Sequence, residues 1–121
     1  MLDIVKYNSE KHIIDVKSVG DLTPQILNQS LSDINNAYNE FKCNKVYVDA
    51  YGVTSFLMPA SAFNFGAELA RLLSECSFAI FTSQNTVKDM AYFEKVANAR
   101  GGNVKLFLDK VETMAWLLKQ H

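Results

Sequence analysis

The sequence contains few residues of the kinds that build disulfide scaffolds, metal centres or membrane spans. It has two cysteines, two prolines, two histidines and one tryptophan in 121 residues. Cys43 and Cys76 lie far apart and in no metal spacing, so we expect two reduced thiols in a cytoplasmic protein and no disulfide framework. The N-terminus lacks the features of a signal peptide, and no apolar run approaches the roughly 20 residues needed to span a bilayer.

The net charge is small, and groups of side chains that could carry out catalysis are lacking. The formal net charge of −1 gives no electrostatic reason to expect a nucleic acid or an anionic membrane as a partner. Histidines, cysteines and acids do not cluster at ligand spacing, and no histidine lies near a candidate nucleophile. We therefore expect no metal, no cofactor and no enzymatic activity.

Apolar residues make up 49% of the chain, which is ordinary for a globular protein. A chain of this length can bury a core without a metal or disulfides. We expect a single domain over residues 1–121.

The N-terminal part of the sequence predicts a hairpin followed by a helix. Stretches rich in β-formers run from Leu2 to Tyr7 and from Lys11 to Val19, and the polar segment between them is short. Thr23 can then cap a helix that has Pro24 in its first turn.

Strands and helices alternate along the rest of the chain. Each further strand is short and apolar, and each helix has its apolar residues three and four positions apart. The pattern gives the order β-β-α-β-α-β-α-β-α, an α/β fold with a mostly parallel five-stranded sheet and an antiparallel N-terminal strand. The later strands are expected at Lys45–Tyr51, Ser77–Thr82 and Val104–Leu108. The later helices are expected at Pro59–Ser74, from Val87 to the turn at Arg100–Asn103, and after Asp109. The apolar residues of the final helix are Val111, Met114, Ala115 and Leu118.

The period of two separates the strand residues into an aliphatic face and a face with aromatics at its centre. Tyr47, Phe81 and Phe107 belong to the second face. If all the helices cover the aliphatic face, these three side chains form an exposed patch of the kind that often marks a homodimer interface. Alternatively, the first or last helix covers the aromatic face.

The stretch from Lys45 to Ser61 is the most probable functional region. It reads as a strand that Gly52 interrupts, an apolar loop, and a helix that begins at Pro59. In open α/β sheets, binding sites lie outside the carboxyl ends of the strands. Phe56, Leu57 and Met58 either complete the core or form a recognition patch over an apolar cavity.

Several segments together resemble STAS domains, in particular the SpoIIAA-like set grouped as STAS/SEC14-like. The resemblance implies the fold predicted above and a regulatory role through protein binding. It rests on the element order and on Val46-Tyr47-Val48-Asp49, Gly52-Val53, Arg100-Gly101-Gly102, Val104-Lys105-Leu106-Phe107, and Asp109 with Ala115-Trp116-Leu117.

The sequence departs from this family at the start of the second helix. Family members that antagonise anti-sigma factors have an acidic residue and a phosphorylated serine there, whereas this chain has Leu57-Met58-Pro59-Ala60. Because of this departure, we expect an apolar contact surface at the start of the second helix in place of the family's phosphorylation site.

We therefore expect a non-enzymatic interaction module that binds a protein partner through this edge. A small apolar-ligand carrier, of the kind that SEC14-like domains represent, is the alternative. A hydrolase that uses Asp49 with Ser55 or Ser83 lacks a base. The predicted partner-binding residues are Asp49, Tyr51, Gly52, Ser55, Phe56, Leu57, Met58 and Ser61.

Overall fold

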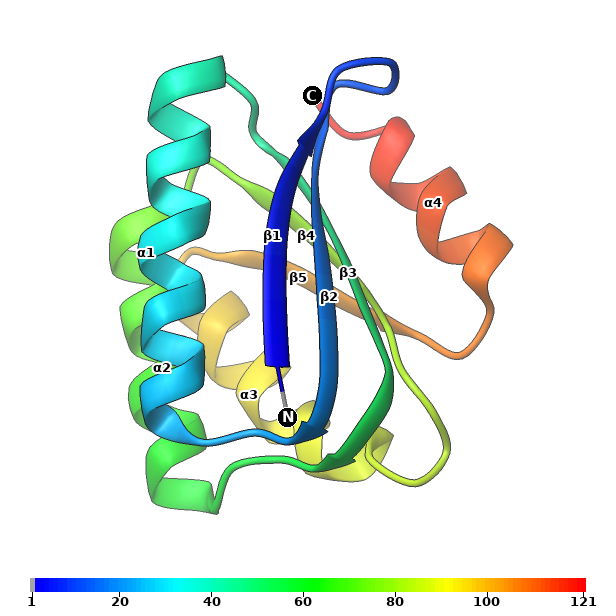
Figure 1. Ribbon diagram of the computed structural model, residues 1–121. Coiled ribbons are helices and arrows are strands. Elements are labelled where there is room, and N and C mark those ends of the chain that lie inside the picture. Colours follow the sequence, from blue (N-terminus) through cyan, green and yellow to red (C-terminus); the bar gives the residue numbers. More distant parts are fainter. Residues whose placement is uncertain (1) are drawn as a thin grey trace.

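The sheet holds its strands in the order in which they occur in the chain, β1-β2-β3-β4-β5, in the computed structural model, which describes residues 2–121 (Figure 1). β1 pairs antiparallel with β2, and all other neighbours are parallel, which confirms the predicted fold class. The elements are β1 (Leu2–Asn8), β2 (Ile13–Asp21), α1 (Pro24–Phe41), β3 (Lys45–Ser55), α2 (Pro59–Leu73), β4 (Ser77–Phe81), α3 (Val87–Ala99), β5 (Asn103–Phe107) and α4 (Lys110–Leu118).

Three helices cover one face of the sheet, and α4 lies on the other (Figure 1). α1, α2 and α3 each connect two neighbouring parallel strands and step across the sheet in the same direction. Right-handed crossovers in one direction put all three helices on the same face. α4 follows β5 and leads to no further strand among residues 2–121, so this rule does not fix its side.

The main core lies between α1–α3 and the aliphatic face of the sheet. Helix residues from the predicted apolar stripes pack against alternate residues of β2 to β5, as the period of two requires. Its largest fully buried side chains include Val16, Val46, Leu69, Leu73 and Phe78.

α4 buries part of the aromatic face and thereby corrects the predicted dimer face. Leu117 packs with Tyr47 in a second core, and Phe81 and Phe107 pack against this core while half-buried. Only 4% of Tyr47 is exposed, so Tyr47, Phe81 and Phe107 do not form an open patch. α4 supplies the apolar cover, which is the second of the two alternatives that the sequence left open: the last helix lies over the aromatic face.

The inner side of α4 differs from the stripe that the sequence suggested. Thr113 and Leu117 are the buried residues of the helix, whereas Val111 and Leu118 are exposed. Asp109 begins the helix as predicted, because its carboxylate accepts a hydrogen bond from the Glu112 amide at 2.8 Å.

The caps of the other helices match the predictions in part. The Thr23 hydroxyl accepts a hydrogen bond from the Ile26 amide at 3.2 Å, which confirms the start of α1. Thr86 lies at the N-cap of α3, but its hydroxyl pairs with that of Thr82 at 2.9 Å and does not cap the helix. The Thr86 side chain is thus used within the core and not for a capping hydrogen bond.

Gly52 does not end the third strand, which continues to Ser55. β2 shifts register at two points and stays paired with β3, so that Val19 lies opposite Gly52 and Asp21 opposite Ser55. A Cβ at Gly52 would lie 2.9 Å from Cγ1 of Val19. The glycine therefore permits a close approach within the strand and does not break it.

The hairpin turn is longer than predicted, because β2 begins at Ile13 and not at Lys11. His12 has a φ of 52°, in the left-handed region. Its Nδ1 atom lies 2.5 Å from the Tyr7 hydroxyl, and the Tyr7 ring stacks on Phe41 at a centroid distance of 4.1 Å. These contacts join the hairpin to the end of α1.

Candidate functional site

The predicted partner-binding residues lie in three different environments. Asp49 and Tyr51 are on the α4 side of the sheet, whereas Phe56 and Leu57 pack into the core on the opposite side. Met58 projects into solvent, with 76% of its surface exposed. The structure therefore brings these residues to one edge of the sheet but does not gather them into one pocket.

Asp49 is bound by neighbouring groups. One carboxylate oxygen lies 3.2 Å from Nζ of Lys17, and the other accepts a hydrogen bond from the Tyr51 amide at 3.2 Å. Tyr51 is 59% exposed and its ring stacks on Phe81, with centroids 5.2 Å apart. Asp49 thus fixes the strand end, and Tyr51 presents an aromatic surface there.

Ser55 contacts an acid that the sequence did not indicate. Oδ1 of Asp21 accepts hydrogen bonds from the Thr54 hydroxyl at 2.6 Å and from the Ser55 hydroxyl at 2.9 Å. These two bonds hold the pKa of Asp21 below its ordinary value of 3.8, and the bond from Thr54 has the larger effect. The cluster ties the ends of β2 and β3 together at the exposed edge.

Phe56 and Leu57 fill the space beneath the loop. Leu57 is buried, and the Phe56 ring packs against Phe93 at a centroid distance of 5.7 Å. Only a small cavity of about 50 Å³ remains in the core, bordered by Phe56, Phe65 and Phe93. It is about a third of the volume of an apolar cavity that accepts benzene.

Met58 occupies the N-cap of α2 but has no side-chain atom that can accept a hydrogen bond from the helix. The first turn of α2 contains Pro59 and no acidic residue. The free amides of this turn therefore face the same edge as the exposed Met58 side chain.

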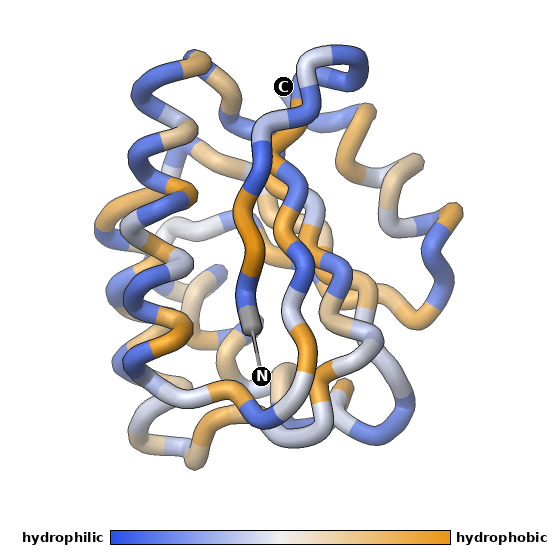
Figure 2. Tube along the Cα trace, viewed as in Figure 1, coloured by the Kyte–Doolittle hydropathy of each residue, from blue (hydrophilic) through white to orange (hydrophobic). Residues whose placement is uncertain are grey.

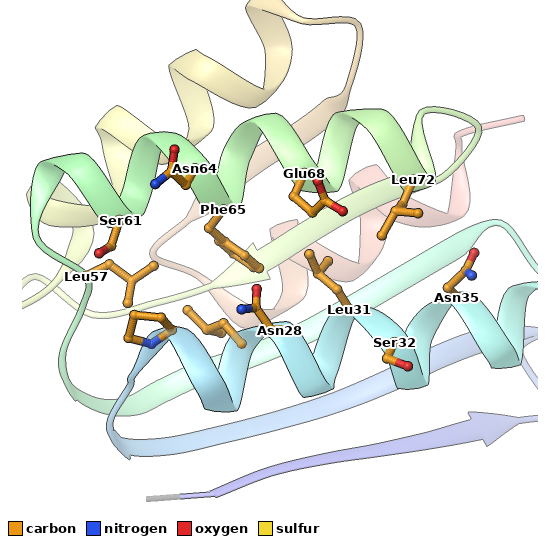
Figure 3. A pocket seen from close by; sticks show the side chains of 12 residues that line it. Asn28, Leu31, Ser32, Asn35, Leu57, Ser61, Asn64, Phe65, Glu68 and Leu72 are labelled. Carbon is orange, nitrogen blue, oxygen red and sulfur yellow. The ribbon is translucent and has the colours of Figure 1, made fainter.

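A groove of about 530 Å³ runs between α1 and α2, and Leu57 and Ser61 line part of it (Figure 3). Its volume is within the range of pockets that bind small molecules or side chains. Apolar residues of both helices form its floor, and amides, hydroxyls and one carboxylate form its rim. The floor includes Leu27, Leu31, Phe65 and Leu72, and the rim includes Asn28, Asn35, Asn64 and Glu68.

The sequence reasoning did not single out the rim residues. Asn28 and Asn35 are seven positions apart and so lie on one side of α1. Glu68 binds Arg71 on α2, and this ion pair holds the pKa of the Glu68 carboxyl below its ordinary value. The repeated asparagine spacing is the sequence signal that indicates this groove.

The candidate site offers little for catalysis. Ser55 and Asp21 have no histidine beside them, because His12 contacts Tyr7 in the hairpin turn. Ser83 is buried, and its hydroxyl has no hydrogen-bond partner among residues 2–121. No group of three or more histidine, cysteine or acidic side chains within that range is arranged to hold a metal ion.

The two cysteines are free and buried. Burial raises the pKa of the Cys76 thiol to about 12, with smaller contributions from Cys43 and Glu75. Burial also raises the pKa of Cys43. Both thiols therefore stay protonated and unreactive in the folded protein.

The strand order, the antiparallel first strand and the placement of the helices define an α/β protein with a SpoIIAA-like fold. A crystal structure of an uncharacterized protein of the DUF3478 family, which has a SpoIIAA-like fold and comes from Shewanella loihica PV-4, superimposes with a TM-score of 0.59. The two sequences are 20% identical, and the match covers 95% of this chain and 91% of that one. The likeness shows the fold, which is the SpoIIAA-like fold that the resemblance implied.

The other comparisons add no relative. No protein-family model matches the sequence, and no curated protein matches it. Within the part of the chain that the structure describes, no helix is both long enough and apolar enough to cross a membrane.

Proposed function

We propose that this chain is a non-enzymatic, cytoplasmic STAS-like module that binds a protein partner through the edge at the carboxyl ends of β2 and β3. The observation that carries the proposal is the exposure of Met58, 76% of whose surface meets solvent at that edge. Burying a methionine side chain on association contributes about 1.5–3 kcal/mol. Leu57 and Ser61, on either side of Met58, line the groove that would receive further side chains of the partner.

The surroundings of Met58 favour recognition over chemistry. The Asp21 cluster and the Asp49 contacts use the polar groups of this edge to hold the strand ends in place. A fixed backbone with an exposed flexible apolar side chain suits contact with a protein, because methionine adapts to irregular surfaces. The cavity of about 50 Å³ gives no support to the alternative of an apolar-ligand carrier, since it has no room for a lipid chain.

The experiment uses immobilised protein to capture partners from source-cell extract, and then measures the affinity of each identified partner. Met58→Asp is expected to weaken binding at least tenfold. Tyr92→Asp is the control, because Tyr92 is also exposed, at 44%, and lies on α3. Asn64→Arg, which places a long side chain in the groove, is expected to weaken binding if the partner enters it.

The proposal fails if Met58→Asp and the unchanged protein bind the same partner equally. It also fails if Tyr92→Asp and Met58→Asp lower the affinity to the same extent, because the loss would then not be specific to this edge.

A further inference from the structure

α4 is apolar on the side that faces the sheet and also on the side that faces solvent. Its inner side includes the buried Thr113 and Leu117, and Met114 and Trp116 pack against the same core while half-buried. Its outer side carries Val111, Ala115 and Leu118, which are all exposed. Figure 2 shows hydrophobic residues along this helix, including the side turned away from the sheet.

Residues four and three positions apart lie on one side of a helix, so Val111, Ala115 and Leu118 form a continuous outer stripe about 10 Å long. Val111 is 77% exposed and Leu118 is 46% exposed. An apolar stripe of this spacing is the pattern by which helices pair. An exposed apolar stripe on a helix that already packs against the sheet on its other side is a surface of the kind that marks an interface.

The helix is held firmly on the sheet. Nζ of Lys45 donates to the Leu118 carbonyl at 3.2 Å, and the Asn44 amide donates to the His121 carbonyl at 3.0 Å. The fully buried Leu117 packs with Ile13, Tyr47 and Ala79 of the sheet. The outer stripe is therefore presented in a fixed position.

The charges beside the stripe complement one another when two copies pair antiparallel. Glu112 in the first turn and Lys119 at the C-cap lie on the same flank of the outer stripe. In an antiparallel pair centred on Ala115, Val111 meets Leu118 of the second copy, and Glu112 meets Lys119 of the second copy. The two-fold symmetry makes each contact twice.

Two further features favour this arrangement. Ala115 at the centre is small, so the helix backbones can approach closely. Antiparallel helices also bring the positive end of one dipole beside the negative end of the other. Parallel pairing would instead place Lys119 beside Lys119 of the second copy.

We propose that α4 is a homodimer interface, in which the outer stripe of Val111, Ala115 and Leu118 packs antiparallel against the same stripe of a second copy. The inference is independent of the partner edge proposed above. The self-association surface proposed here lies on α4, the helix that covers the aromatic side chains, and not on the sheet itself. Two short helices bury less than the ~1,200 Å² of a standard interface, so the dimer is weak and forms at micromolar or higher concentration.

The first test is the molar mass by sedimentation equilibrium, from about 1 µM to about 1 mM. The unchanged protein is expected to shift from monomer to dimer across this range, and Val111→Asp to remain monomeric. Met58→Asp, which removes an equally exposed apolar side chain elsewhere, is expected to dimerise like the unchanged protein. Failure of this proposal is thus distinguishable from failure of the proposed partner edge.

Charge reversal tests the antiparallel register. Glu112→Lys and Lys119→Glu are each expected to weaken dimerisation between about twofold and thirtyfold, because each breaks two exposed ion pairs. The double variant restores both pairs with the charges exchanged and is expected to recover the original dissociation constant.

A cysteine at the centre of the stripe gives an independent readout. Ala115→Cys is expected to cross-link to its copy when diamide takes two electrons and two protons from the paired thiols. Cys43 and Cys76 are buried, and a control cysteine at the exposed Tyr92 lies on α3. A strict monomer at 1 mM, a double variant no better than either single one, or equal cross-linking at positions 92 and 115 overturns the proposal.

Discussion

The side chain of Asn98 pairs with both backbone groups of Val104. Its amide oxygen accepts a hydrogen bond from the Val104 N–H at 2.8 Å, and its amide nitrogen donates to the Val104 carbonyl at 2.9 Å. Glu94 extends the pattern by accepting from the Leu106 N–H at 2.9 Å. α3 therefore occupies the outer edge of β5 in the way that a further strand would.

Removing the Asn98 amide should expose this edge. Asn98→Ala is expected to lower the free energy of unfolding by about 1–3 kcal/mol, because the two backbone groups of Val104 lose their partners. Urea denaturation measures the loss, and light scattering detects association through the opened edge. Asn36→Ala on α1 is the control, because it makes the same helical substitution at an exposed position. Equal stability of the two variants would contradict the role of Asn98.

Met58→Asp should stabilise the protein even though it weakens partner binding. Met58 lies at the N-cap of α2 with an extended backbone and no side-chain cap, and aspartate accepts hydrogen bonds at that position. The expected gain is about 0.5–2 kcal/mol in the free energy of unfolding at neutral pH. Urea denaturation of Met58→Asp and Met58→Ala measures it. A destabilised Met58→Asp protein would mean that its binding loss reports unfolding.

Gly66→Ala should destabilise the contact between α2 and α3. A Cβ at Gly66 would lie 3.1 Å from the Phe93 carbonyl and 3.2 Å from Cγ1 of Val96. This overpacking outweighs the gain in helix propensity, for an expected net loss of about 1–2 kcal/mol. Val96→Ala should relieve part of the clash, so the double variant should lose less than the sum of the two single losses. Strict additivity in thermal or urea unfolding would argue against the close contact.

Tyr47→Phe should stabilise the protein by about 1 kcal/mol, because the Tyr47 hydroxyl is buried and has no hydrogen-bond partner among residues 2–121. Burial, and then Asp49 and Asp15, raise the pKa of Tyr47 from 10 to about 12. Because Tyr47 ionises at lower pH in the unfolded chain than in the folded protein, the unchanged protein has its full stability below pH 10 and loses stability as the pH rises from 10 through 12.

The measurement for Tyr47→Phe is urea denaturation at pH 7 and at several values between pH 10 and pH 12. The unchanged protein should lose more stability over the alkaline range than Tyr47→Phe does. Cys76 titrates in the same range in both proteins and so cancels in the difference. Parallel pH profiles would contradict the assignment to Tyr47.

Local signals were sufficient to predict most of the fold. The Thr23 cap, the hairpin and the alternation of short apolar strands with helices depend on neighbouring residues, and right-handed crossovers between them imply a mostly parallel sheet. The side of α4 could not be predicted in this way, because no strand follows it and because its apolar residues lie on both sides. Gly52 was misread for a related reason: its close contact, Val19, is distant in sequence.

The candidate site was predictable only as a region. Its place at the carboxyl ends of the strands follows from the fold, but whether Phe56 or Met58 meets solvent depends on how the loop packs. Asp21 was missed because its contacts with Thr54 and Ser55 arise only when β2 and β3 align. The groove rim was missed because α1 and α2 each present polar residues that become neighbours only in three dimensions.

The identity of strand order and chain order has a consequence for how the protein is made. Each new strand emerging from the ribosome finds its neighbour already synthesised, so the sheet can grow by one strand at a time. α4 is synthesised after all five strands, and Tyr47, Phe81 and Phe107 face water until it docks. The nascent chain thus passes through a stage in which this aromatic surface has no cover, and association between chains is most favoured at that stage.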